Sequence, residues 1–200
     1  MAIAPLQTKV ASVTGNAGYG DSLTVGLDTL PGVGSSVTVN AVLFHGDGNP
    51  VASITDTHSN VWTFQGFSLP AIMGQNWLIG TWLCSDVKIK VIAPFSVTIT
   101  PAREAMMTAC VREYPGILTR VGSASTGIGN TSPIVTALTT TATDVLLEST
   151  VTSQANGAGI TVPGGWTGSV KNDWVPAGFA YSNSVGAGSK SVAWALTTAV

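Results

Sequence analysis

Short segments in which apolar and polar residues alternate recur along the whole chain of 200 residues. Leu23, Val25 and Leu27 are separated by small polar residues or glycine, and the segment FSVTIT at 95–100 repeats the pattern. Because successive side chains of a β-strand point to opposite faces, a period of two predicts a strand with one buried face. The chain is therefore expected to form β-sheets from short strands that are separated by turns.

We expect an all-β fold, an antiparallel β-sandwich that is jelly-roll-like and has about ten short strands, in a single domain covering residues 1–200. The segments that carry the pattern most clearly are 22–27, 37–45, 51–55, 61–67, 76–85, 95–100, 143–153 and 190–197. The strands at 51–55 and 61–67 flank the polar turn DTHSN, which predicts a hairpin. The segment 76–85 is apolar on both faces, which is typical of a central strand covered on two sides.

The alternation also predicts which side chains form the core. The expected inward residues are Val37, Val39, Ala41, Leu43, Trp62, Phe64, Phe95, Val97, Ile99, Met107, Ala109, Val111, Val145, Leu147, Val151, Val192, Trp194 and Leu196. Only the segment PAREAMMTACVREY at 101–114 is ambiguous, because a proline in the first turn and two methionines also suit a helix. We interpret its second half as a strand that ends at Pro115 and Gly116.

The chain carries few charges. Lys and Arg total 8, Asp and Glu total 10, and charged residues make up 9% of the sequence. Without a basic cluster, nucleic acid is not an expected partner. No apolar run is long enough to cross a bilayer, and residues 1–10 lack the features of a secretory signal, so we expect synthesis in a cytoplasm and no membrane partner. Cys84 and Cys110 are expected to be buried free thiols.

No group of residues forms a recognisable catalytic set, so we predict no enzymatic activity, no catalytic residue, no metal site and no cofactor. His45 and His58 have no metal-ligand spacing and are interpreted as surface histidines at turns. The segment HGDGNP at 45–50 offers Asp47 and Asn49 as calcium ligands, but a plain tight turn is the favoured interpretation. The glycines of TGNAGYG at 14–20 lack the lysine and helix of a phosphate-binding loop.

Two glycine-, serine- and threonine-rich connections, at 122–132 and 154–176, are long for a sandwich. The second connection contains Trp166, Lys171, Asp173 and Trp174. Aromatic anchors beside a few charges are typical of interfaces, and exposed tryptophans also serve as platforms for sugars. These four residues are therefore the predicted interface or ligand contact, with burial of Trp166 and Trp174 under a loop as the alternative. Trp62, Trp77, Trp82 and Trp194 are assigned to the core.

Two segments resemble a known family. ITDTHSNVWTF at 54–64 is similar to a strand-turn-strand signature of β-sandwich domains in tailed-bacteriophage virion proteins and in some bacterial surface proteins. CVREYPGI at 110–117 is similar to a strand that follows in those domains. The order of the later strands is similar as well. His58 and Ser59 depart from the pattern, because a small residue and a glycine are common there. The resemblance implies a fold and supplies no catalytic residues.

The resemblance and the low charge together suggest a non-enzymatic virion structural protein, either a capsid decoration protein or a minor tail protein, located in the virion after synthesis in the host cytoplasm. Its expected partners are other virion proteins and copies of itself as a homo-oligomer. The alternative is a carbohydrate-binding or adhesion module whose partner is a host-surface glycan.

Overall fold

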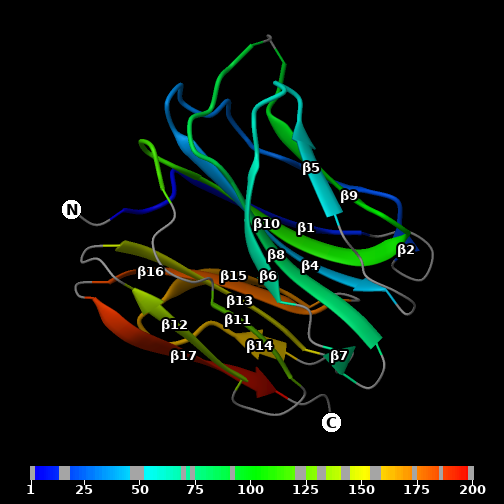
Figure 1. The fold of residues 1–200 in the computed structure, drawn as a ribbon, viewed down its shortest axis with the longest axis vertical. Coiled ribbons are helices and arrows are strands. Elements are labelled where there is room, and N and C mark those ends of the chain that lie inside the picture. The colour runs from blue at the N-terminus through cyan, green and yellow to red at the C-terminus, as the bar shows by residue number, and fades with distance from the viewer. Residues whose placement is uncertain are drawn as a thin grey trace. The chain divides into compact units, whose positions relative to one another are not determined.

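A computed structural model gives the fold of the chain (Figure 1). It describes residues 3–13, 19–45, 52–68, 71–72, 75–90, 93–119, 125–129, 134–140, 145–153, 159–172, 175–184 and 187–197. Every regular element in these ranges is a β-strand, and none is a helix. The predicted all-β class is confirmed, as are antiparallel sheets in a sandwich-like arrangement. The one parallel pair among the described strands joins β11 (Ser125–Gly129) to β13 (Val145–Ser153).

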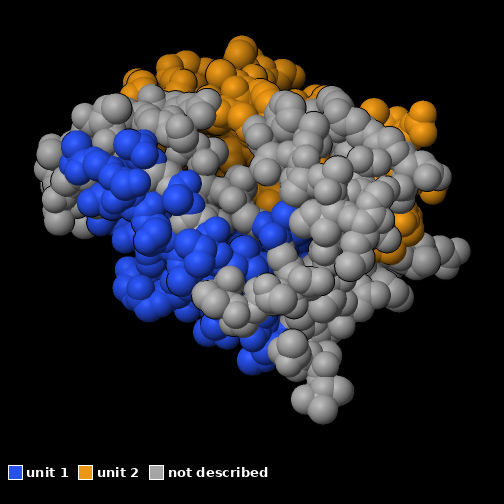
Figure 2. Space-filling model, turned by 60° about the horizontal axis from the view of Figure 1, so that its bottom comes forward, with its two compact units in different colours: residues 1–3, 120–200 blue, residues 4–119 orange. Residues whose placement is uncertain are grey.

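The chain divides into two compact units, which Figure 2 colours separately. Unit 2 comprises residues 4–119, and unit 1 comprises residues 1–3 and 120–200. The single domain over residues 1–200 stays a prediction, and each unit is described by itself below.

Unit 2 contains two sheets. Its strands are β1 (Gln7–Ser12), β2 (Tyr19–Gly20), β3 (Leu23–Gly26), β4 (Ser36–His45), β5 (Ala52–Asp56), β6 (Thr63–Ser68), β7 (Ala71–Ile72), β8 (Gln75–Cys84), β9 (Ser96–Pro101) and β10 (Ala105–Tyr114). The larger sheet has the order β1-β10-β4-β8-β6, with β2 beside β10 and β7 beside β8, and the smaller has the order β3-β9-β5. The ambiguous segment at 101–114 is thus a strand from Ala105 onward, as predicted.

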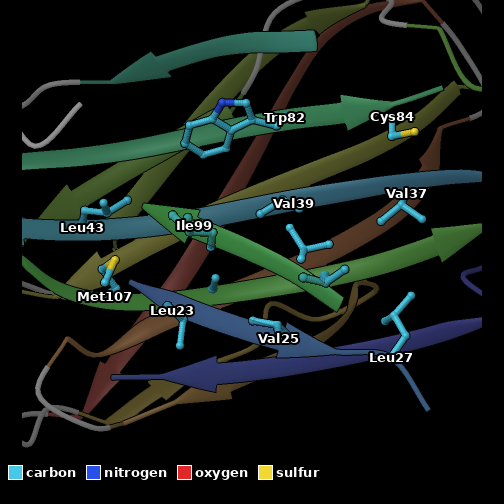
Figure 3. Close-up of a cluster of buried hydrophobic side chains, with 14 of the residues drawn as sticks. Leu23, Val25, Leu27, Val37, Val39, Leu43, Trp82, Cys84, Ile99 and Met107 are labelled. Atoms are coloured by element: carbon cyan, nitrogen blue, oxygen red, sulfur yellow. The ribbon is translucent and has the colours of Figure 1, made fainter. Parts of the chain in front are cut away.

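The core of unit 2 lies between these two sheets. Figure 3 shows side chains from both, with Leu23 and Val25 of β3 and Ile99 of β9 facing Val39 of β4 and Met107 of β10. The predicted inward faces of β4, β9 and β10 are all buried here. Burial of this many branched apolar side chains, at about 25 cal/mol per Å² of apolar area, is the main stabilising contribution to such a sandwich.

Two neighbouring interior strands of the larger sheet, β4 and β8, are buried on both faces. In β4, Thr38, Asn40 and Val42 alternate with the core residues and are buried as well. The Thr81 hydroxyl of β8 donates to Asn40 Oδ1 at 2.8 Å, which satisfies part of this buried amide. The prediction that residues 76–85 form a central strand is confirmed, since β8 lies between β4 and β6.

The predicted hairpin of residues 51–55 and 61–67 is wrong. β5 pairs with β9 and β6 pairs with β8, so the turn between them carries the chain from one sheet to the other. The inward assignment of Phe64 is also wrong, because its side chain is 44% exposed. β6 is the last strand of its sheet, and Phe64 packs on Trp82 with 5.2 Å between ring centroids. Trp62 is half-buried against the core.

Unit 1 also contains two sheets. Its strands are β11, β12 (Ile134–Thr140), β13, β14 (Gly159–Thr161), β15 (Thr167–Lys171), β16 (Ala177–Ser184) and β17 (Gly188–Thr197). One sheet has the order β11-β13-β16-β15 and the other has the order β12-β17-β14. Leu147, Val151, Val192, Trp194 and Leu196 are buried as predicted, whereas the side chain of Val145 lies outside the described residues.

Two hydrogen bonds attach the start of the described chain to unit 1. The Ile3 amide donates to Asn183 Oδ1 at 2.9 Å, and Asn183 Nδ2 donates to the Ile3 carbonyl at 2.9 Å. The side-chain amide of Asn183 therefore binds the Ile3 peptide as a neighbouring strand would.

The described residues form seventeen strands, more than the ten expected. Most of the additional strands are short, and they lie where the sequence predicts loops. β11 lies in the connection 122–132, and β14 and β15 lie in the connection 154–176. The prediction of two long loops is therefore corrected, because the first connection contains one short strand and the second contains two. These segments consist mostly of small polar residues and glycine, so they lack the apolar alternation from which a strand is predicted.

Candidate functional site

The turn after β5 is closed by one carboxylate. Asp56 accepts hydrogen bonds from the His58 amide at 2.7 Å, the Asn60 amide at 3.1 Å and the Trp62 indole Nε1 at 2.7 Å. Ser59, in the same turn, has a φ of 53°, the left-handed conformation that glycine adopts most readily. The Asp-to-Trp segment that resembles the virion signature is therefore a structural turn in this chain.

His58 is buried, so its assignment as a surface histidine is wrong. Its ring stacks on Phe95 with 5.6 Å between centroids, its Nδ1 accepts from the Lys90 amide at 3.3 Å, and its Nε2 lies 3.2 Å from the Ala93 carbonyl oxygen. A neutral ring with its proton on Nε2 satisfies both contacts. The ring therefore connects Lys90, Ala93 and Phe95 to the turn that Asp56 closes.

A second carboxylate, the buried one of Glu113, fixes the loop before β4. Glu113 accepts from the Gly32 amide at 2.8 Å and from Gln7 Nε2 at 2.6 Å. The Gln7 side chain also contacts the backbone of Thr29 through two hydrogen bonds of 3.1 and 3.3 Å. Residues 29–32 are thus held against the start of β1 and the end of β10.

The neighbouring segments at this end of unit 2 are held in the same way. The Ser36 hydroxyl donates to the Gly116 carbonyl, at 2.8 Å, and accepts from the Leu118 amide. Backbone hydrogen bonds join Gly34 and Ser35 to Val87, and the Lys88 amide donates to Asn60 Oδ1 at 2.7 Å. Backbone groups in four connecting segments therefore have specific partners, which restricts their conformations.

These fixed segments carry exposed aliphatic side chains, and we call this set the loop end of unit 2. It consists of Leu6, Leu30, Val33, Val61 and Ile117. Val33 is 76% exposed and Val61 is 84% exposed. Isolated exposed aliphatic residues are ordinary. Here five of them lie on segments whose backbone conformation is restricted by hydrogen bonds, so little further ordering of these segments is needed for an apolar contact.

The predicted contact residues lie elsewhere, in unit 1. Trp166 is half-buried against the core cluster around Trp194, and its amide donates to the Pro163 carbonyl at 3.1 Å. Lys171 is the last residue of β15, while Asp173 and Trp174 lie outside the described residues. Trp166 directly precedes β15 and Lys171 ends it. The assignment of Asp173 and Trp174 to a contact surface stays a prediction.

The described residues contain no cluster of three or more His, Cys, Asp or Glu side chains placed to hold a metal ion. Asp47 and Asn49, the calcium alternative, lie outside these residues, as does most of the glycine loop before Tyr19. No helix in the described ranges is long and apolar enough to span a bilayer. Cys84 and Cys110, both described, are buried thiols that form no disulfide, as predicted. Burial raises the pKa of the Cys84 thiol above its ordinary value of 9.0.

The loop end could not be found from alternation, because Leu6, Leu30, Val33 and Ile117 lie outside the alternating segments and Val61 is only the first residue of one. The available signal was an aliphatic residue between turn formers, as in Leu30-Pro31-Gly32-Val33-Gly34. A valine that no strand or helix pattern explains is a candidate for an exposed contact.

Comparisons with known proteins give no family assignment. No protein-family model matches the chain, and the comparisons with curated proteins and with solved structures gave no match either.

Proposed function

We propose that this chain is a non-enzymatic structural protein of a tailed-bacteriophage virion, a capsid decoration or minor tail protein that acts through protein–protein contacts. It is made in the host cytoplasm and located in the virion. The partner at the loop end of unit 2 is an apolar surface of another virion subunit. The resemblance of residues 54–64 and 110–117 to sandwich domains of virion proteins supports this setting.

The observation that carries the proposal is the loop end itself. Leu6, Leu30, Val33, Val61 and Ile117 are exposed on segments that are fixed by hydrogen bonds. A protein that presents apolar groups on preorganised loops loses little conformational entropy on binding. This arrangement suits a subunit that adds to a preformed lattice.

The roles of the buried polar groups also support an assembly protein. Asp56, His58 and Glu113 lie near this end, and each is engaged with backbone or side-chain groups of its own fold. These groups stabilise turns, so the surface they support is available for contacts rather than for acid–base chemistry.

The direct experiment is mass spectrometry of purified particles from the phage that encodes the chain. We expect the chain in the particles at a stoichiometry that matches a repeating position. Complete absence from the particles would contradict the proposal. Binding on a glycan array without incorporation would favour the carbohydrate-binding alternative instead.

A pair of variants tests the surface. Val33→Lys combined with Val61→Lys adds two charges to the loop end and should reduce incorporation strongly, because each lysine must lose hydration in an apolar contact. The control is Val135→Lys in unit 1, which adds one lysine outside the loop end at a valine that is 59% exposed. Both proteins should melt normally. Equal incorporation of both would exclude the loop end as the contact.

A further inference from the structure

The strand β15 forms an exposed edge of unit 1. Among the described strands its only ladder partner is β16, so its other side has no strand beside it there. Thr167, Gly168 and Val170 are exposed, and Val170 is 38% exposed despite its apolar side chain. The open side of an edge strand presents backbone N–H and C=O groups to any extended chain.

Two edges of unit 2 carry features that prevent strand addition. β6 has a bulge between Phe64 and Gly66, and Gly66 has a φ of 132°. β1 carries Lys9 in its middle, where the ammonium pairs with Asp28 at 2.8 Å. A bulge and a central charge are both common ways of protecting an edge.

The other edges of unit 1 are short or covered. β11 and β12, the edge strands on one side of the two sheets, lie against each other. β14 has three residues, and its Ile160 amide donates to Asn172 Oδ1 at 3.4 Å. β15 differs from all of these, because its five residues pair with β16 without a register shift and its only charge is at the last position.

The sequence of β15 is complementary to itself in antiparallel register. When Ser169 lies opposite Ser169 of a second copy, Gly168 faces Val170 and Thr167 faces Lys171. No lysine then faces a lysine, and each valine lies opposite the space left by a glycine, so the cross-strand pairs are compatible.

The same register extends the apolar core. Gly168 and Val170 are ladder partners of Ala180 and Gly178, and Ala180 belongs to the buried cluster that Trp166 also contacts. Val170 therefore lies on the core side of its sheet but at the open rim. A second copy would cover that rim with its own Val170.

We propose that β15 pairs antiparallel with β15 of a second copy about a two-fold axis at Ser169, joining two four-stranded sheets into one continuous sheet. The inference deepens the proposed assembly role by naming the surface for self-association. It needs no particle for its test, so a dimer that never enters virions would contradict the proposed function alone.

The test is the molar mass of the purified chain, measured by light scattering over a concentration series. We expect a dimer. Val170→Lys should raise the dissociation constant about tenfold or more, since the lysine must lie beside the new strand pair. Val135→Lys, the same change at an exposed valine of β12, should leave the dimer intact. A wild-type chain that is monomeric at its highest soluble concentration overturns the inference.

Charge swapping at the two-fold axis tests the register. Ser169→Lys and Ser169→Glu each place like charges opposite each other, so each variant alone should be monomeric. A mixture of the two should dimerise again, because opposite charges then face across the axis. Circular dichroism checks that both variants fold. Dimers that persist in both single variants, or a mixture that stays monomeric, would rule out this pairing.

Discussion

The Trp62 indole donates its Nε1 proton to Asp56 Oδ2 at 2.7 Å, across the turn that carries the chain from β5 to β6. The two residues are six positions apart, and the strands they join belong to different sheets. The hydrogen bond therefore holds together the point where the two layers of unit 2 are connected. The Asp56 carboxylate also accepts the His58 and Asn60 amides in this turn.

Asp56→Ala should destabilise the protein by about 1–3 kcal/mol, because the amides of His58 and Asn60 and the Trp62 indole lose their acceptor. Urea unfolding measures the change. Asp28→Ala is the control, since Asp28 is 69% exposed in its ion pair and should cost less than about 1 kcal/mol. Equal effects of the two changes would contradict the role given to Asp56.

Ser59→Gly should stabilise the protein, because a non-glycine residue in the left-handed region costs about 1–2 kcal/mol, part of which the greater freedom of unfolded glycine offsets. We expect a small rise in melting temperature. Gly34→Ala should do the opposite, since Gly34 has a φ of 79° and open space around it, so that only backbone strain opposes the change. A lower melting temperature for Ser59→Gly would refute the assignment.

Phe95→Ala should cost about 3–5 kcal/mol, as is usual for a fully buried aromatic side chain. The variant also removes the ring that stacks on His58. Phe64→Ala should cost clearly less, because that side chain is 44% exposed and removing it takes less apolar area out of the interior. Denaturant unfolding of both variants checks the order, and a larger effect at Phe64 would contradict the described packing.

The stability of the fold should decrease above pH 9, with Cys84 as one cause. Burial raises the pKa of the thiol above 9.0, so the unfolded chain loses this proton at a lower pH than the folded chain does. The contribution is complete below the unfolded pKa and is lost as the pH rises through the folded pKa. Urea unfolding at pH 7 and pH 10 should show a smaller difference for Cys84→Ala than for the wild type. An unchanged difference would exclude the thiol.

The sequence predicted the strands whose apolar residues alternate. β3, β4, β9, β10 and β17 have their expected buried faces, because sheet formation on one apolar face leaves little choice of register. The partners of the strands could not be predicted in the same way. The local sequence of β5 and β6 is typical of a hairpin, but β5 pairs with β9 and β6 pairs with β8 instead of with each other.

The candidate site was less predictable than the fold. Alternation describes the side of a strand that is buried, whereas the exposure of Val33 and Val61 depends on hydrogen bonds to Glu113, Ser36 and Asn60 from distant positions. β15 was hidden for another reason. Its residues Thr, Gly, Ser, Val and Lys have no strong alternation, and pairing with β16 makes them a strand.

The pairing of Ile3 with Asn183 also constrains the order of events during synthesis. The two residues are 180 positions apart, and at 5–20 residues per second the ribosome makes the second about 10–40 s after the first. Residues 4–119 are complete well before that moment, so unit 2 can fold while Ile3 still lacks its partner. Ile3 is therefore among the last residues to reach its native position.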